Sequence, residues 1–158
     1  MIAGIKMRFY SVKNSLGMTL LELLIVLAII VILASVGIPS YQTFIANERF
    51  AIASNELYNA YRFARNEAIK TSSSMILKPK TGGWVNGWQV TDNSDTVLLV
   101  SKKPHDSITV TGVEVTVEGM GALSDGGVTF SITGPGGKLN CLSVLSSGQS
   151  QLKPEACS

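Results

Sequence analysis

The chain divides into three stretches by its pattern of hydrophobic and polar positions. Residues 18–38 are almost uninterruptedly apolar and carry one charge, Glu22. Residues 39–70 repeat apolar side chains every three or four positions, and the short segments after Thr71 alternate apolar with polar residues. The first two patterns predict helix and the last predicts strands. We therefore expect an α+β chain, in which a long N-terminal helix packs on a C-terminal antiparallel β-sheet domain.

The apolar stretch 18–38 is long enough to cross a membrane. As a helix, its 21 residues span about 31 Å at 1.5 Å per residue, which matches the hydrocarbon core of a bilayer. Lys6, Arg8 and Lys13 precede it and no acidic residue does. The positive-inside rule then places the N-terminus in the cytoplasm and the residues after 38 outside, as a single-pass protein.

Two simpler membrane interpretations leave Glu22 unexplained. One is an ordinary secretory signal peptide, cleaved near residues 34–37. The other is a plain signal anchor. A carboxylate costs about 2.5–3.5 kcal/mol at the centre of a membrane helix and less near the interface. Neither interpretation gives a reason for that cost, and the helical pattern continues past the point where a signal peptide would be cut.

Residues 39–70 form the second half of the same predicted helix. The apolar stripe consists of Phe50, Ala53, Leu57, Ala60, Tyr61, Ala64 and Ala68. Such a stripe is typical of an amphipathic helix that packs on a core. Because the pattern resumes directly after Pro39, we expect this proline to bend the helix rather than end it. One helix from Met18 to about Lys70 is predicted.

The remaining residues, 71–158, are expected to form a β-rich globular domain of about six to eight strands. The expected strand segments are 74–79, 87–91, 96–101, 107–118, 127–132 and 139–145, and turn clusters rich in Gly, Asp and Asn separate them. Residues 107–118 alternate regularly, which suits antiparallel strands with one face in water. Trp84 and Trp88 are expected in the core.

The two cysteines, Cys141 and Cys157, lie close together near the C-terminus. They have neither the spacing nor the nearby histidine of a metal or redox site, so a structural disulfide is favoured. Closing a loop of about 15 residues would stabilise the fold by about 3 kcal/mol. A disulfide also indicates an oxidising compartment.

Three other features could indicate a catalytic residue, a phosphate-binding loop or a calcium site. His105 is the only histidine, and it lies in a turn cluster without a second catalytic group. The segment 134–139, GPGGKL, lacks the upstream glycine and the Ser/Thr of a phosphate-binding loop, so it is expected to be a hairpin turn. Asp92 and Asp95 lack the spaced ligands of a calcium loop. We therefore predict no catalytic residue, no metal site and no cofactor, and a protein that is not an enzyme.

The N-terminal residues resemble the class III signal of type IV pilins and type II secretion pseudopilins. The resemblance rests on the cations, on Gly17-Met18-Thr19-Leu20-Leu21-Glu22 and on the apolar run that follows. It implies that residues 1–17 are a leader, cut after Gly17 by a prepilin peptidase that then methylates the amine of Met18. Glu22 becomes the fifth mature residue, a charge used in assembly. Met18 replaces the usual Phe, and Val31 stands where many major pilins have glycine.

The second half of the chain resembles the GspH/FimT branch of minor pilins and pseudopilins, most closely its FimU type. This resemblance rests on ARNEAIK at 64–70, on Trp84, Gly87 and Trp88, and on DNSD at 92–95. It implies a minor pilin that helps to initiate or cap pilus assembly. Its partners would be other minor and major pilins and an inner-membrane assembly platform, and residues 18–38 would anchor it before entering the filament core. A GspH-type pseudopilin of a type II secretion system and a FimT-like pilin that binds DNA remain alternatives.

The DNA alternative depends on a C-terminal GRxR motif that some FimT-type members carry on a flexible tail. The corresponding stretch here is Gly148-Gln149-Ser150-Gln151, so both arginines are glutamines. Glutamine releases no counterions on binding to phosphates. Without residues 1–17, 10 of the 13 Lys and Arg remain against 11 Asp and Glu, a net charge of −1. Lys153 does not replace the arginines, although Lys102, Lys103 and Lys138 could form a basic patch elsewhere.

Overall fold

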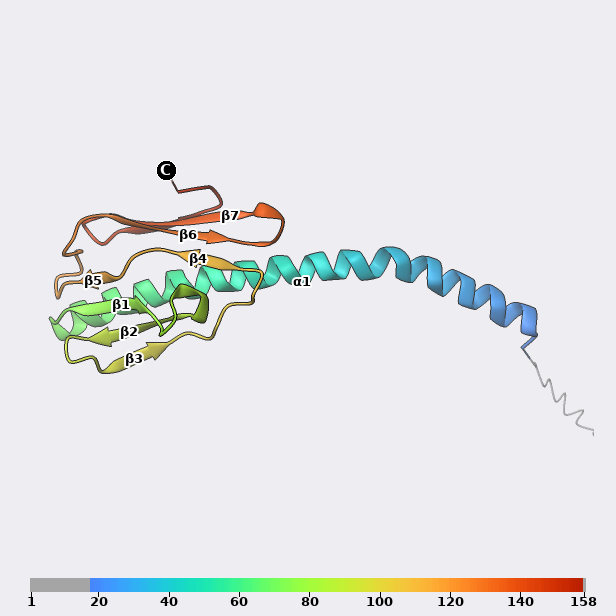
Figure 1. Ribbon diagram of the computed structural model, residues 1–158, viewed down its shortest axis with the longest axis horizontal. Coiled ribbons are helices and arrows are strands. Elements are labelled where there is room, and N and C mark those ends of the chain that lie inside the picture. Colours follow the sequence, from blue (N-terminus) through green and yellow to red (C-terminus); the bar gives the residue numbers. More distant parts are fainter. Residues whose placement is uncertain (1–17, 158) are drawn as a thin grey trace, which may run out of the picture. The chain divides into compact units, whose positions relative to one another are not determined.

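The computed structural model describes residues 18–157, and its first element is one long helix. Helix α1 runs over Leu20–Thr71 and continues through Pro39 (Figure 1). This confirms the single helix predicted from the sequence. The chain divides into two compact units, a first that ends at Ser40 and a second that comprises Tyr41–Ser158.

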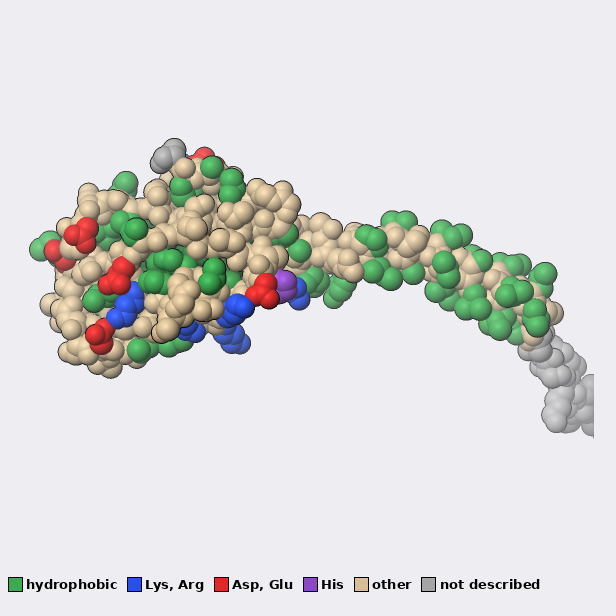
Figure 2. All heavy atoms as spheres, viewed as in Figure 1, with side chains coloured by type: hydrophobic (Ala, Val, Ile, Leu, Met, Phe, Trp, Pro, Cys, Tyr) green, Lys and Arg blue, Asp and Glu red, His purple; other side chains and the backbone are tan. Residues whose placement is uncertain are grey.

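The described part of the first unit is the apolar half of α1. Its large apolar residues are all exposed, with exposed fractions from 38% for Val26 to 76% for Leu20. Figure 2 shows these hydrophobic side chains all along this part of the helix. By length and composition, α1 is the one helix in the described part of the chain that could cross a membrane.

The second unit contains two four-stranded antiparallel sheets. The first has the order β3-β2-β1-β5 and consists of β1 Met75–Pro79, β2 Trp88–Asp92, β3 Val97–Val100 and β5 Val115–Val117. The second has the order β4-β6-β7-β8 and consists of β4 Thr109–Thr111, β6 Val128–Thr133, β7 Leu139–Val144 and β8 Ser150–Lys153. Short 3-10 helices cover Trp84–Asn86 and Pro135–Gly137.

A shared core joins the second half of α1 to both sheets. All seven residues of the predicted apolar stripe are buried, and Ser54 is buried with them. They pack in one cluster with strand residues such as Leu77, Val90 and Phe130. Trp88 is fully buried and Trp84 nearly so, which confirms both as core residues. The helix therefore serves as the third layer of the second unit.

The predicted strand segment 107–118 contains two strands that belong to different sheets. β4 pairs with β6, whereas β5 pairs with β1. Gly112 follows β4 directly, and a Cβ at this position would lie 2.2 Å from a carbon of the Phe130 ring. The Gly112 carbonyl accepts a hydrogen bond from the Trp84 indole nitrogen, at 3.0 Å. A glycine here lets the backbone pass close over Phe130 as the chain changes sheets.

One strand, β8, was not among the predicted segments. It pairs with β7 over four residues, from Cys141 opposite Lys153 to Val144 opposite Ser150. The four-residue sequence SQLK is short and mostly polar, so it carries almost no strand signal of its own. Pairing with β7 imposes the strand. The stretch 148–151, which corresponds to a tail motif in some relatives, thus runs into a sheet in this chain.

Candidate functional site

The start of α1 carries the residues predicted to control assembly. Thr19 caps the helix: its Oγ1 accepts a hydrogen bond from the backbone N–H of Glu22 at 3.1 Å, and its carbonyl accepts one from Leu23 at 3.1 Å. Glu22 therefore lies in the first turn, where the partial positive charge of the helix end favours a carboxylate. Threonine followed three residues later by glutamate is the sequence signature of a capping box. This capping signal, Thr19 followed by Glu22, is visible in the sequence alone.

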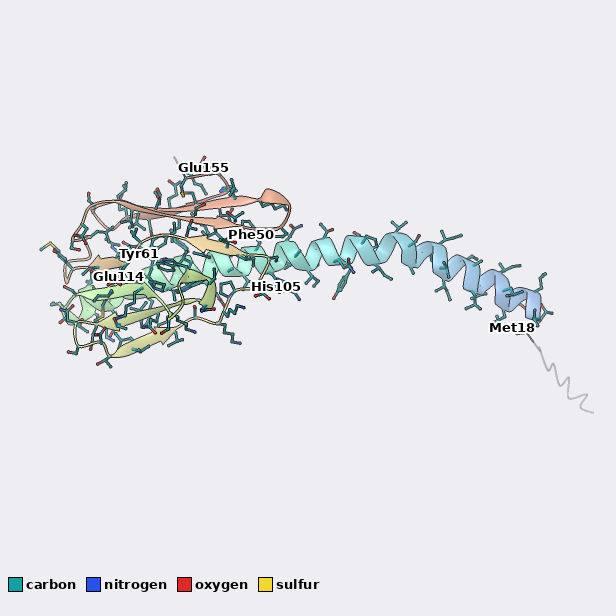
Figure 3. The ribbon with its side chains drawn as sticks, viewed as in Figure 1. Met18, Phe50, Tyr61, His105, Glu114 and Glu155 are labelled. Carbon is teal, nitrogen blue, oxygen red and sulfur yellow. A yellow bond between two sulfur atoms is a disulfide. The ribbon has the colours of Figure 1, made fainter. Side chains whose placement is uncertain are left out.

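The predicted leader, residues 1–17, and Gly17 at its end lie outside the described residues. Met18 is described: it precedes the helix and is 58% exposed (Figure 3). Glu22 is also exposed, and within residues 18–157 it forms no ion pair. The structure thus brings Met18 and Glu22 to the same helical end, where no Lys or Arg among the described residues pairs with the carboxylate.

The exposed apolar surface of the first unit is the largest feature that the fold leaves uncovered. Large side chains on every side of the helix, from Leu20 to Ile38, are exposed. A soluble monomer rarely exposes contiguous apolar surface of this extent. This half of α1 therefore needs lipid or other apolar helices around it.

The cysteine pair lies in the second sheet. Cys141 and Cys157 form a disulfide with a Cα–Cα distance of 5.1 Å. Cys141 belongs to β7, and Cys157 follows β8, so the bond fastens the C-terminal segment to the strand beside it. The pairing is the one favoured from the sequence.

The remaining candidates serve local structure. His105 is an exposed loop residue whose Nε2 lies 2.8 Å from an Nη of Arg49. Asp92 Oδ1 accepts hydrogen bonds from the backbone N–H groups of Ser94 and Thr96, both at 2.8 Å. The bond from Thr96 is the main cause that lowers the pKa of Asp92. Asp95 pairs with Lys78, so neither aspartate directs its contacts toward a shared ligand.

Three of the four basic residues considered for DNA contact neighbouring acidic or polar side chains. Lys103 pairs with Asp106 at 2.6 Å, and Lys153 pairs with Glu155 at 3.5 Å. Lys138 donates to the Asn47 side chain of α1 at 2.8 Å. Most of these charges are thus engaged by neighbouring acidic or polar side chains.

Within the segment 134–139, residues 134–138 connect the antiparallel strands β6 and β7, which confirms the predicted hairpin turn. The backbone N–H of Gly134 donates to the carbonyl of Lys138 at 2.8 Å. Gly136 and Gly137 both have positive φ angles, of 70° and 76°. The glycines therefore serve the turn.

Comparisons with known protein families cover both parts of the chain. The model described as "Type II transport protein GspH" matches residues 53–148, and the model described as "Prokaryotic N-terminal methylation motif" matches residues 12–38. Two proteins of Pseudomonas aeruginosa, each described as "Fimbrial protein", are 36% identical over 106 residues, which cover 56% of this chain and 68% of each relative.

Solved structures share the fold. A crystal structure of the type IV minor pilin FimU of Pseudomonas aeruginosa superposes with a TM-score of 0.59 and 21% identity, over 70% of this chain and 92% of FimU. The minor pseudopilin EpsH from the type 2 secretion system of Vibrio cholerae gives a TM-score of 0.54 and 11% identity, over 66% of this chain and 95% of EpsH. At these identities the two likenesses establish the fold.

Proposed function

Because this chain belongs to the GspH family of pilins and pseudopilins, we propose that it is a minor type IV pilin, a structural subunit that helps to initiate or cap pilus assembly. The observation that carries this proposal is the apolar half of α1, whose side chains are exposed from Leu20 to Ile38. The fimbrial relatives and the likeness to FimU support the pilus as the assembly in which that surface is covered. Family and fold are those of structural pilins rather than of enzymes.

Processing at the N-terminus would convert the anchor into an assembly element. Cleavage after Gly17 and methylation of Met18 place a cationic amine two residues before α1 begins. That amine has the same sign as the positive end of the helix dipole, so it is disfavoured there. The carboxylate of Glu22 in the first turn offsets this charge.

Glu22 also favours association of the helix with a second subunit. A carboxylate in apolar surroundings is costly unless a cation and hydrogen bonds satisfy it. In a stack of such helices, the Met18 amine of one subunit meets the Glu22 carboxylate of another as a charge-assisted pair. Glu22 is thus unfavourable in a single membrane helix but stabilises the association of several such helices.

The chain is then divided by role. Residues 18–38 hold the subunit in the inner membrane before assembly and pack in the filament core afterwards. Residues 39–70 support the β-domain, and residues 71–158 contact neighbouring subunits from the periplasmic side. Its partners are the prepilin peptidase, the inner-membrane assembly platform, and other minor and major pilins.

A second candidate is a GspH-type pseudopilin of a type II secretion system. The likeness to EpsH and the description of the matching family favour it. A pseudopilus uses the same kind of apolar helix and the same N-terminal processing, so the two candidates differ in the machine and not in the chemistry of the helix.

Deletion of the gene in the source bacterium separates these functions. The strain is scored for surface pili, for type II secretion and for DNA uptake, and each defect is complemented with the wild-type gene. We expect loss of pili with secretion intact. Loss of secretion with normal pili would replace the pilin assignment with the pseudopilin one, and loss of DNA uptake alone would favour a DNA receptor.

A pair of variants then tests the assembly charge. Glu22→Ala is expected to reach the membrane at the wild-type level and to fail to restore pili. Glu48→Ala removes an exposed carboxylate farther along the same helix and is expected to restore them. Normal piliation by Glu22→Ala would remove the role given to this residue.

A further inference from the structure

A polar cleft lies on the second unit between α1 and the turn that precedes β8. Its volume is about 540 Å³. Its walls are Tyr58, Arg62, Arg65 and Asn66 of the helix, together with Gly148 and Gln149 of the turn and Ser150 at the start of β8. The lining contains two arginines, amide and hydroxyl groups and no carboxylate. Nothing in the proposed assembly of the apolar helix uses it.

Hydrogen bonds between α1 and the neighbouring turns fix the walls of the cleft. Tyr61, which is fully buried on α1 (Figure 3), donates its hydroxyl to the Gly148 carbonyl at 2.8 Å. Arg65 donates its Nε to the Gly121 carbonyl at 3.0 Å. Gly148 has a φ of +79°, and a Cβ there would lie 1.8 Å from the Gly121 oxygen. Helix and turns are thus fastened together, and the walls are arranged before any ligand arrives.

The two arginines have no acidic partner in the described part of the chain. Arg62 is exposed and lies over the Tyr58 ring, with its guanidinium carbon 5.6 Å from the ring centroid. Arg65 is half-buried, and its hydrogen bond to Gly121 uses Nε, one of the five N–H donors of a guanidinium. Guanidinium groups bind carboxylates and phosphates through two parallel hydrogen bonds. The cleft therefore suits an anionic group.

The positively charged surface of the cleft is limited to Arg62 and Arg65, because the nearby lysines pair with acidic residues. Lys70, on the next turn of α1 after Asn66, pairs with Glu67 at 3.1 Å, and Lys153, after Ser150, pairs with Glu155. Duplex DNA carries a charge about every 1.7 Å, and proteins that bind it commonly neutralise about 6–10 phosphates. Two arginines without acidic partners can neutralise one or two carboxylates, but not the series of phosphates along a DNA duplex.

We propose that this cleft binds an acidic side chain of a neighbouring subunit in the assembled filament. Arg62 and Arg65 pair with the carboxylate, and the side-chain amides of Asn66 and Gln149 bond to the peptide backbone beside it. The proposal rests on the proposed function, because it requires an assembly of pilin-type subunits. It adds a lateral contact of the second unit to the association of the apolar helices.

The test is photo-crosslinking of the full chain in the source bacterium, with a benzophenone amino acid in place of Ser147, an exposed residue directly before Gly148. We expect a crosslink to another pilin subunit, at a segment that contains Asp or Glu. Arg62→Gln in the same chain is expected to reduce the crosslink at least about fivefold. Lys70→Gln removes one positive charge from the same helix outside the cleft and is expected to leave the crosslink unchanged. Since Arg62 is exposed and lies outside the buried core, its replacement is not expected to disturb the core.

Charge reversal makes the test specific. Arg62→Glu should abolish the crosslink, and replacement of the partner's carboxylate by lysine should restore it. A crosslink insensitive to Arg62→Gln, or one to a segment without Asp or Glu, contradicts the proposal. So does binding of the full chain in detergent micelles to a 20-base-pair duplex that depends on Arg62. An arginine-dependent crosslink to a pseudopilin carboxylate would uphold the cleft and refute only the pilus assignment.

Discussion

Replacing Tyr61 with phenylalanine tests how the turn before β8 is held on α1. The substitution removes one oxygen and keeps the ring that fills the core. The lost hydrogen bond is 2.8 Å long and joins two buried residues, Tyr61 and Gly148. The Gly148 carbonyl would be left without its partner. An unsatisfied buried acceptor costs about 1–3 kcal/mol, so we expect the free energy of unfolding to fall by about 2 kcal/mol.

The assay is guanidinium chloride unfolding of the full chain in detergent micelles. Trp84 and Trp88 are the two tryptophans of the sequence and both lie in the core of the second unit, so their fluorescence reports on it. For a small domain the dependence of stability on guanidinium is about 2–6 kcal/mol per M. A loss of about 2 kcal/mol then lowers the unfolding midpoint by about 0.3–1 M.

Tyr58→Phe is the matched control. It makes the same change one turn earlier on α1, at a half-buried residue whose ring lies against Arg62. Its effect is expected to stay below about 0.5 kcal/mol. Equal shifts of the two midpoints would refute the role given to the Tyr61 hydroxyl.

The dependence of the free energy of unfolding on alkaline pH tests the role of Tyr61 independently. Burial raises the pKa of Tyr61 above its usual 10.0, and the nearby Arg65 opposes this only in part. The unfolded chain therefore releases the proton first. The contribution of Tyr61 is fully present below pH 10 and is lost as the pH rises toward the folded-state pKa. Tyr61→Phe should lack this decline, and an unchanged alkaline limb in the variant would contradict the assignment.

Three further substitutions probe the second unit by the same unfolding assay. Serine at both Cys141 and Cys157 should lower stability by about 3 kcal/mol, as expected for a disulfide across 16 residues; a loss below about 1 kcal/mol would show that pairing of the strands alone holds the C-terminus. Gly148→Ala should lower the free energy of unfolding by at least about 2 kcal/mol, because the added methyl group meets the Gly121 carbonyl. As a control, Gly136→Ala meets no atom within 4 Å and should cost only the positive-φ penalty of about 1–2 kcal/mol. Equal losses of stability in the two variants would exclude the clash. Because hydrogen bonds lower the pKa of Asp92 below 3.8, Asp92→Ala should be less stable than wild type at neutral pH, with a difference that disappears as the pH falls through the folded-state pKa; a constant difference would contradict this.

The elements that long periodic patterns specify could be predicted from the sequence. The stripe from Phe50 to Ala68 predicted both the helix and the face that it buries, because seven positions share one period. Trp84 and Trp88 were predicted in the core from size and surroundings, and the disulfide from the lack of any other use for two cysteines. In each case the local pattern and the final packing agree.

Other features depend on contacts between distant residues. β8 is a strand because β7 lies beside it, and the change of sheet at Gly112 depends on the ring of Phe130, 18 residues later. The cleft requires Arg62 and Arg65 on α1 to meet a turn more than 80 residues along the chain. Two arginines three positions apart were visible in the sequence, but nothing local indicated that they would lack acidic partners.

The proposed function makes this chain a processed subunit of a pilus filament. The most direct measurement is the intact mass of the protein recovered from surface filaments sheared off the source bacterium. We expect a chain that begins at Met18, carries one methyl group and contains the Cys141–Cys157 disulfide. A chain that keeps residues 1–17, or one found in the membrane fraction and absent from the filaments, would contradict it.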